Sequence, residues 1–277
     1  MTAPPPDPLP SRIIASADGT PIAVFSSGNG PPLVLVHGAA ADHTTFRVVG
    51  PLLAGRFTIH GIDRRGRGAS GDTAPYAIDR EFEDLAAVAA MLARDAGRPV
   101  DVFGHSYGGR CALGAALLTA DIGRVISYEG APTPPGERYG DAALARELAA
   151  LANAGRNERL LEQFMTRVVG MTPHELDRYR ADPVWPRRVD AAPTIARELA
   201  VESGDAAGLD RLGAVRQPVL QLLGGDSRRE FGVATASPDD RLADGTIVVI
   251  PGAKHAGHHT HPHEVVEAVT TFLAQPT

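Results

Sequence analysis

The sequence predicts an α/β fold, with a mostly parallel central sheet, helices on both faces of the sheet and a helical cap insertion. Three observations support this prediction. Short apolar runs alternate with helical patterns over residues 32–129, the alternation stops between about 137 and 205, and it resumes at residue 218. Strands separated by helices form a parallel sheet that is buried on both faces.

The predicted strands fall into two groups. RIIAS and PIAVFSS flank the turn ADGT at 17–20, where Asp18-Gly19 favours a hairpin. The remaining strands are nearly continuous apolar runs, as expected when both faces are covered. These runs are PLVLVHG (32–38), FTIHGID (57–63), PVDVFGHS (99–106), RVISYE (124–129), PVLQLLGG (218–225) and TIVVIPG (246–252).

Helices are predicted between these strands and at the end of the chain. The segment 79–97 has apolar residues at helical spacing and ends at Gly97, a common helix stop. The other expected helices of this part are TTFRVVGPLLAG (44–55), YGGRCALGAALLTA (107–120) and HEVVEAVTTFLA (263–274). The predicted core therefore consists of residues 1–136 and 206–277.

Residues 137–205 show only helical patterns and are predicted to form the cap. ALARELAALANAG (143–155) and ERLLEQFMTRVVG (158–170) repeat apolar residues at helical spacing. TPHE (172–175) is a capping box with proline in the first turn. An insertion of this kind usually lies over the carboxyl ends of the strands, where such folds bind ligands.

Composition limits the range of functions. The 277 residues carry a net charge of −6 with scattered basic residues, which gives no reason to expect a nucleic-acid partner. Cys111 is the single cysteine, so no intrachain disulfide can form. The start MTAPPPDPLPSR lacks the basic and apolar parts of a secretory signal, and no run approaches the ~18 apolar residues of a membrane span. We expect a cytoplasmic protein, of bacterial type by its Arg-, Ala- and Gly-rich composition, whose oligomeric state the sequence leaves open.

The strongest chemical signal is GHSYGG at residues 104–109. It fits Gly-x-Ser-x-Gly, with a predicted strand before it and a predicted helix after it. Glycines are needed because the turn from strand to helix leaves no room for a β-carbon on either side of the serine. The turn lifts the Ser106 hydroxyl above the sheet, next to a helix N-terminus that favours negative charge.

These motifs resemble those of the α/β-hydrolase family over almost the whole chain. VLVHGAA is similar to the family's oxyanion loop, DRRGRGAS (63–70) to its Asp-x-Arg-Gly-x-Gly-x-Ser loop, and PGAKHAGHHTHP to its late histidine loop. The resemblance implies Ser106 as nucleophile and His255 as base. It also implies an oxyanion hole made by the backbone N–H groups of Ala39 and Tyr107. Lys254 departs from the glycine that many relatives have before the histidine.

Two carboxylates compete for the acid of the triad, which would hold the imidazole tautomer. In most family members an aspartate follows the strand that corresponds to PVLQLLGG, but here Ser227 has that position and Asp226 comes one residue early. In a minority of relatives the acid follows the preceding strand, where Glu129 stands. The displaced aspartate and the well-placed glutamate favour Glu129, and both choices preserve the family's order of serine, acid and histidine.

Other polar residues have simpler interpretations. We expect His37 to be structural, His105 to be packed, and Cys111 to be a small buried hydrophobic residue. The tract HAGHHTHPH could suggest zinc, but it has no cysteine or well-spaced carboxylate nearby, so we expect no metal and no cofactor.

A serine nucleophile indicates acyl chemistry. The resemblance implies that members of this fold that attack alkyl halides and epoxides use an aspartate instead. We therefore expect a hydrolase of a carboxylic ester or lactone with an apolar or aromatic small-molecule acyl substrate. The large insertion residues available for its pocket are Phe164, Met165, Met171, Tyr179 and Trp185, although each is individually a better candidate for the insertion's core. A cofactor-free lyase, cyclase or haloperoxidase-like enzyme on the same fold and a receptor-like binding protein are the alternatives.

Overall fold

The computed structural model describes residues 9–134, 137, 139–201, 209–238 and 241–276. The eight-stranded sheet has the order β1-β2-β4-β3-β5-β6-β7-β8. β1 pairs antiparallel with β2 and β2 antiparallel with β4, whereas the other neighbours are parallel. The strands are β1 (Arg12–Ala15), β2 (Pro21–Gly28), β3 (Pro32–Val36), β4 (Thr58–Ile62), β5 (Val100–His105), β6 (Ile122–Tyr128), β7 (Val219–Gly224) and β8 (Gly245–Ile250). The predicted fold class is confirmed.

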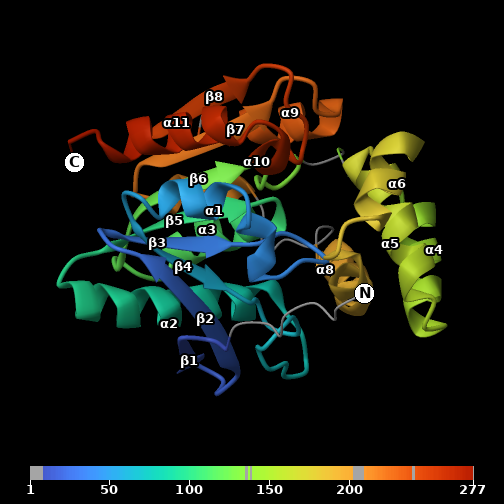
Figure 1. Cartoon of the computed structure of the whole chain (residues 1–277), viewed down its shortest axis with the longest axis horizontal. Helices are drawn as coiled ribbons and strands as arrows, with labels where there is room; N and C mark the ends of the chain where they lie inside the picture. Colours follow the sequence, from blue (N-terminus) through green and yellow to red (C-terminus); the bar gives the residue numbers. More distant parts are fainter. Residues whose placement is uncertain (1–8, 135–136, 138, 202–208, 239–240, 277) are drawn as a thin grey trace.

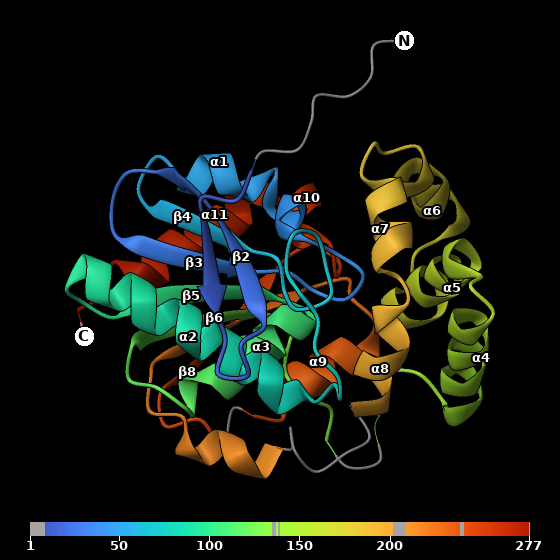
Figure 2. The same ribbon diagram turned by 90° about the horizontal axis from the view of Figure 1, so that it is seen from below.

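Helices cover both faces of this sheet (Figures 1 and 2). Alternate residues of one strand serve opposite faces, because successive side chains of a strand point to opposite sides. In β3, Val34 and Val36 pack in the apolar cluster of α2 and α3, whereas Leu33 and Leu35 pack in the cluster of α1 and α11. The helices outside the insertion are α1 (Val49–Leu53), α2 (Ile78–Ala96), α3 (Tyr107–Ala116), α9 (Arg229–Ala236), α10 (Gly257–Thr260) and α11 (Pro262–Leu273), with 3₁₀ turns at η1 (His43–Phe46) and η4 (Leu209–Ala214).

Two details differ from the sequence prediction. The helix expected over 44–55 is divided into the 3₁₀ turn η1 and the short helix α1. Asp42 explains the early start, because its side chain accepts a hydrogen bond from the backbone N–H of Thr44 and caps η1. The helix α9 between β7 and β8 was not predicted. The stop at Gly97 is confirmed, since this residue caps α2 in the left-handed conformation with φ 65°.

The insertion is helical in every described element between β6 and η4. Its helices are α4 (Ala142–Asn153), α5 (Asn157–Phe164), the π-helical turn η2 (Met165–Val169), α6 (Pro173–Arg180), α7 (Trp185–Ala191) and α8 (Thr194–Val201). The capping box of TPHE is confirmed at the start of α6. Residue 136 and the boundary expected at 205–206 lie outside the described residues, as do the first eight residues of the proline-rich start.

The insertion lies on one side of the sheet. In Figures 1 and 2, α4 to α8 gather beside the core. Leu148, Phe164 and Ile195 of the insertion share an apolar cluster with Ala40 after β3 and Phe231 of α9. The insertion is therefore packed against the loops that follow the parallel strands.

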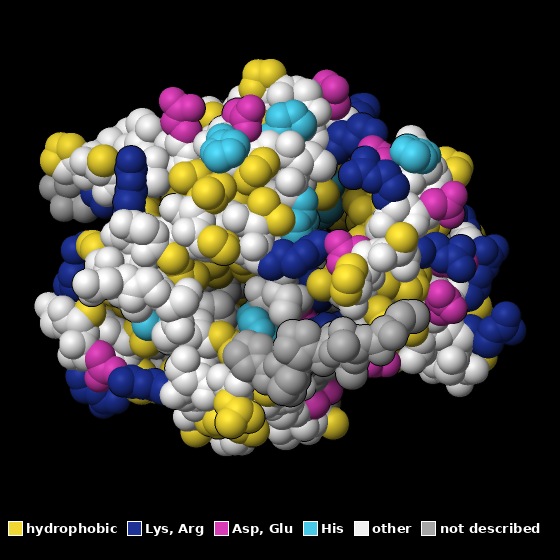
Figure 3. All heavy atoms as spheres, in the orientation of Figure 1, with side chains coloured by type: hydrophobic (Ala, Val, Ile, Leu, Met, Phe, Trp, Pro, Cys, Tyr) yellow, Lys and Arg dark blue, Asp and Glu magenta, His cyan; other side chains and the backbone are white. Residues whose placement is uncertain are grey.

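The described helices include none with the combination of length and apolar character that would cross a bilayer. On the face shown in Figure 3, Lys and Arg side chains are mixed with Asp and Glu side chains, without one patch of a single charge.

Candidate active site

Ser106 lies in a tight turn between β5 and α3. Its φ of 53° and ψ of −128° are rarely adopted by residues with a side chain. A β-carbon on Gly104 would lie 2.3 Å from the carbonyl oxygen of Gly108, and one on Gly108 would lie 2.2 Å from that of Val36. The two glycines of the motif are thus required by backbone packing, and the turn exposes Ser106 to a pocket.

The loop after β3 approaches the nucleophile closely. A β-carbon on Gly38 would lie 2.9 Å from the β-carbon of Ser106. Ala39 follows at the pocket wall, and Ala40 adopts a positive φ of 47°. Tyr107 is the first residue of α3, so its N–H has no acceptor within the helix. The two residues predicted for the oxyanion hole therefore border the same pocket as Ser106.

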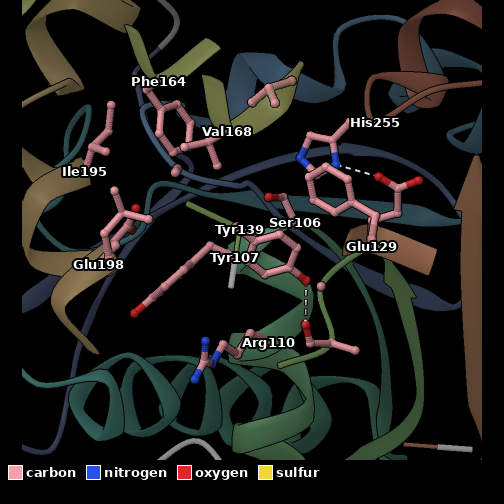
Figure 4. A pocket seen from close by; sticks show the side chains of 16 residues that line it. Ser106, Tyr107, Arg110, Glu129, Tyr139, Phe164, Val168, Ile195, Glu198 and His255 are labelled. Carbon is pink, nitrogen blue, oxygen red and sulfur yellow. Dashed lines mark hydrogen bonds and ion pairs between the residues drawn. The ribbon is translucent and has the colours of Figure 1, made fainter. Parts of the chain in front are cut away.

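His255 and Glu129 form a hydrogen-bonded pair. Nδ1 of His255 lies 2.6 Å from Oε2 of Glu129, and both residues are buried. A carboxylate only accepts hydrogen bonds, so the bond fixes a proton on Nδ1 and leaves Nε2 as the free ring nitrogen. Both residues line the pocket that holds Ser106 (Figure 4).

The other oxygen of Glu129 is also held. Oε1 accepts hydrogen bonds from the backbone N–H of Gly224 at 2.8 Å and from Oγ of Ser227 at 2.5 Å. The backbone of Glu129 has a positive φ of 48°, and its N–H donates to the carbonyl of Leu222. The carboxylate is therefore fixed by the end of β7, the strand after which most family members carry the acid.

Asp226 lies elsewhere. Its side chain is exposed, and among the described residues it makes no hydrogen bond or ion pair with His255. The neighbouring Arg228 and Arg229 pair with Glu230 and Glu137. Of the two carboxylates considered, the structure brings Glu129 and not Asp226 to the histidine.

Several contacts hold the histidine loop. Nε2 of His105 lies 2.8 Å from the backbone carbonyl of His255, and the hydroxyl of Tyr128 donates to the carbonyl of Lys254. Lys254, the departure from the family pattern, forms a 2.9 Å ion pair with Glu175 of α6. Phe231 stacks on the His255 ring with centroids 4.2 Å apart. His255 is thus fixed from both the core and the insertion.

The pocket is mainly apolar. In Figure 4, Ser106, His255 and Glu129 lie on one side, and Ile195 and Glu198 of α8 on the other. Of the five large insertion residues suggested by the sequence, Phe164 is among the lining residues. The others pack in the apolar cluster of the insertion. The lining residues are Ala39, Ser106, Tyr107, Arg110, Glu129, Gly130, Ala131, Tyr139, Phe164, Val168, Val169, Ile195, Glu198, Leu199, Phe231 and His255.

The remaining polar candidates are buried. His37 bonds the carbonyl of Gly38 through Nδ1 and accepts from the N–H of Arg64 through Nε2, as expected of a structural histidine. Burial lowers the pKa of His37 to about 3. Burial raises the pKa of the Cys111 thiol, which therefore stays protonated and is a poor nucleophile. The described residues contain no group of three or more His, Cys, Asp or Glu side chains placed to hold a metal ion.

A buried ionic cluster adjoins the pocket. Arg64 binds Glu81 through two 2.7 Å hydrogen bonds and Glu198 through one of 2.5 Å. Arg67 also contacts both carboxylates. Glu198 comes from α8, so these arginines of the DRRGRGAS loop join the core to the insertion.

Sequence reasoning missed Phe231, Glu198 and the role of Ser227 as a hydrogen-bond donor. For Ser227 a signal existed, because it has the position of the family's usual acid. Glu198 is the single glutamate of the amphipathic helix α8, and its burial depends on arginines that are distant in the sequence.

Comparisons with known proteins agree with this architecture. A profile of the "Alpha/beta hydrolase family" matches residues 33–268. The 2-(acetamidomethylene)succinate hydrolase of Mesorhizobium japonicum is 28% identical over 261 residues, covering 90% of each chain. An α/β hydrolase from Sphaerobacter thermophilus has a structure that matches with a TM-score of 0.78 and 33% identity, over 93% of this chain and 100% of the other.

An esterase from Rhodococcus sp. ECU1013 matches with a TM-score of 0.77 and 25% identity, over 95% of this chain and 98% of the other. The family profile covers most of the sequence and includes Ser106, Glu129 and His255. This chain belongs to the α/β-hydrolase family.

Proposed function

We propose that the protein hydrolyses a carboxylic ester or lactone of an apolar or aromatic small molecule through an acyl-enzyme. The observation that carries the proposal is the common pocket of Ser106 in its strained turn and the hydrogen-bonded pair of His255 and Glu129. The named hydrolase and esterase relatives support the reaction class. The helices of the insertion would act as the cap that shapes the substrate pocket.

Each residue has a defined part in this mechanism. Oγ of Ser106 attacks the carbonyl carbon while Nε2 of His255 takes the hydroxyl proton. Glu129 stays ionised and stabilises the resulting imidazolium. The negative oxygen of the tetrahedral intermediate accepts hydrogen bonds from the N–H groups of Ala39 and Tyr107, and removing one such donor typically costs ~3–4 kcal/mol.

The intermediate collapses when the bond to the leaving oxygen breaks and His255 returns the proton to it. Water then attacks the carbonyl carbon of the acyl-enzyme and gives a proton to His255. The bond between this carbon and Oγ of Ser106 breaks, His255 returns the proton to Oγ, and the carboxylic acid is released. The reaction needs no metal or redox partner in this scheme. In a lactone the leaving oxygen stays on the same molecule, so the product is a hydroxy acid.

Fluorophosphonate labelling tests the nucleophile. We expect intact-mass spectrometry to show one phosphonyl adduct on the wild-type protein and none on Ser106→Ala, which should remain folded. A panel of aryl esters, aliphatic esters and lactones then tests hydrolysis, with Ser106→Ala as the background. Labelling without hydrolysis of any panel member would favour the lyase, cyclase or haloperoxidase-like alternative, and a folded protein that is not labelled would favour a binding protein.

A further inference from the structure

One residue that lines the pocket, Glu198, has a carboxylate oxygen without a hydrogen-bond partner among the described residues. Glu198 is 2% exposed and lines the pocket. Its Oε1 accepts the hydrogen bonds of Arg64 and Arg67, whereas its buried Oε2 has no hydrogen-bond partner among the described residues. Leaving a buried polar atom without a partner costs free energy, so such an atom on a residue that lines a pocket points to a donor supplied by the ligand.

The other carboxylate of the cluster shows the contrast. Glu81 receives hydrogen bonds on both oxygens, from Arg64, Arg67 and the hydroxyl of Tyr76. It is therefore satisfied within the protein. Glu198 differs because it extends from α8. Its Oε1 binds the arginines of the core, and its Oε2 has no partner among the described residues.

The charge balance of the cluster limits the kind of donor. Two guanidinium groups, of Arg64 and Arg67, face the two carboxylates of Glu81 and Glu198. The negative charge of Glu198 is thus already compensated, and Oε2 offers an acceptor without excess charge. A neutral hydroxyl or amide N–H suits this position, whereas a ligand carboxylate would place one acceptor against another.

We propose that the substrate carries a neutral hydrogen-bond donor, a hydroxyl or amide N–H, on the part of its acyl group distant from the reacting carbonyl, and that Oε2 of Glu198 binds it. The donor would lie away from the reacting carbonyl, because Glu198 is across the pocket from Ser106 and His255 (Figure 4). Ile195, Leu199 and Phe164 also line the pocket, which suits an apolar middle portion of the substrate. The proposal rests on the proposed function and adds a specificity residue to it.

Matched esters test the proposal. We would use 4-nitrophenyl esters of ω-hydroxy acids of several chain lengths, each paired with an ester in which a methyl group replaces the terminal hydroxyl. A third series carries a terminal carboxylate. At one chain length the wild-type enzyme should prefer the hydroxyl ester over the methyl ester by about tenfold or more in kcat/KM, as for a hydrogen bond to a charged acceptor. The carboxylate ester should be the poorest of the three.

Two variants separate recognition from stability. Glu198→Gln retains the volume but replaces one acceptor with an NH₂ donor, so the preference for the hydroxyl should fall to about one while the methyl ester is still hydrolysed. Asp72→Asn is the control, because Asp72 pairs at 2.6 Å with the neighbouring Arg197 of α8 and does not line the pocket. It should keep the full preference. If Glu198→Gln does not fold, Glu198→Asp keeps the charge on the arginines and draws the acceptor back, and it should lose the preference too.

The outcomes distinguish this proposal from the proposed function. Equal kcat/KM for hydroxyl and methyl esters at every length, a retained preference in Glu198→Gln, or the carboxylate ester as best substrate would overturn the role of Glu198 while leaving ester hydrolysis intact. If wild-type protein hydrolyses none of the esters, the proposed function fails. The dissociation constants of the same pairs with Ser106→Ala, measured by calorimetry, then still test Glu198, and equal affinities would overturn it.

Discussion

Glu129 and Asp226 differ in what they can do for His255. Replacing Glu129 with Gln keeps its shape but removes the charge that stabilises the imidazolium, so we expect kcat to fall on the order of a thousandfold or more. Asp226→Asn should stay close to wild type, because the Asp226 side chain is exposed. Steady-state hydrolysis of one ester by both variants checks this, and a crippled Asp226→Asn beside a normal Glu129→Gln would reverse the assignment.

The five histidines of the tract HAGHHTHPH offer a second comparison. His255→Ala should lower kcat as far as Ser106→Ala, because nucleophile and base act as one unit. His258→Ala should reduce activity far less, since the buried His258 packs against Phe46 and His105 without bonding Glu129. Rates of hydrolysis, corrected for the folded fraction, provide the measurement. A loss in His258→Ala equal to that in His255→Ala would mean that the base was chosen wrongly.

The sequence could predict much of this site but not its contacts. The Ser106 turn was predictable because Gly104 and Gly108 report a local backbone requirement. The acid was reduced to two candidates, and the position of Asp226, one residue early, favoured Glu129. The contact with His255 itself could not be predicted, because it depends on where a side chain points. Glu129 reaches His255 through a positive φ, and this conformation is uncommon for Glu.

The turn that carries Ser106 depends on the packing of neighbouring elements. A β-carbon at Gly108 would lie 2.2 Å from the carbonyl oxygen of Val36 and 2.5 Å from that of His37, so β3 and α3 would have to separate. We expect Gly108→Ala to lower the free energy of unfolding by ~1–3 kcal/mol. It should also slow fluorophosphonate labelling strongly, because the loop of Ala39 would move with β3.

Gly97→Ala is the matched control for that prediction. Gly97 also requires a positive φ, but a β-carbon there would have nothing within 4 Å. Its cost should be limited to the left-handed conformation, about 1 kcal/mol, with labelling of Ser106 unchanged. Urea unfolding and labelling rates measure both variants. Equal labelling rates in the two would show that the close contact of β3 and α3 does not position the site.

Strands and helices were predicted correctly where the sequence has a strong local pattern of apolar residues. The buried strands were found because each is a continuous apolar run. The helix predicted over 44–55 was longer than α1, because Phe46, Val49 and Leu53 have helical spacing. In the structure, a 3₁₀ turn capped by Asp42 comes first. The helix α9 was missed because its buried residues, Phe231, Ala234 and Thr235, include a single large apolar side chain.

The whole molecule contains several buried histidines, and these should make its stability sensitive to mild acid. Burial is the main cause that lowers the pKa of His259 to about 4 and that of His37 to about 3, and it also depresses the pKa values of His105 and His258. The unfolded chain binds these protons near the ordinary pKa of about 6.5, well before the folded chain does. The stability that these neutral, buried histidines contribute is therefore fully present above about pH 6.5. The free energy of unfolding falls as the pH decreases toward 4 and below.

His259 allows this effect to be tested on one residue. Between pH 7 and pH 5 its shift should contribute a loss on the order of 2 kcal/mol in the free energy of unfolding. The acids Asp42 and Glu81, whose pKa values are lowered by arginines, lose their contribution only below about pH 4 and so do not act in this window. The raised pKa values of Asp84 and Asp101 act in the opposite direction, but they are common to wild type and variant.

We therefore expect urea unfolding of the wild-type protein to give a clearly lower free energy at pH 5 than at pH 7, and His259→Asn to show a smaller difference between the two values. The difference between pH values is the relevant quantity, because the substitution also removes the ring contact of His259 with His258, at 4.2 Å between centroids. An identical pH dependence in both proteins would mean that His259 binds its proton equally well in the folded and unfolded chains. In that case its partial burial beside Arg47 and Arg188 would not penalise the imidazolium. The acid sensitivity would then come from the buried His37, His60, His105 and His258, whose pKa values burial also lowers.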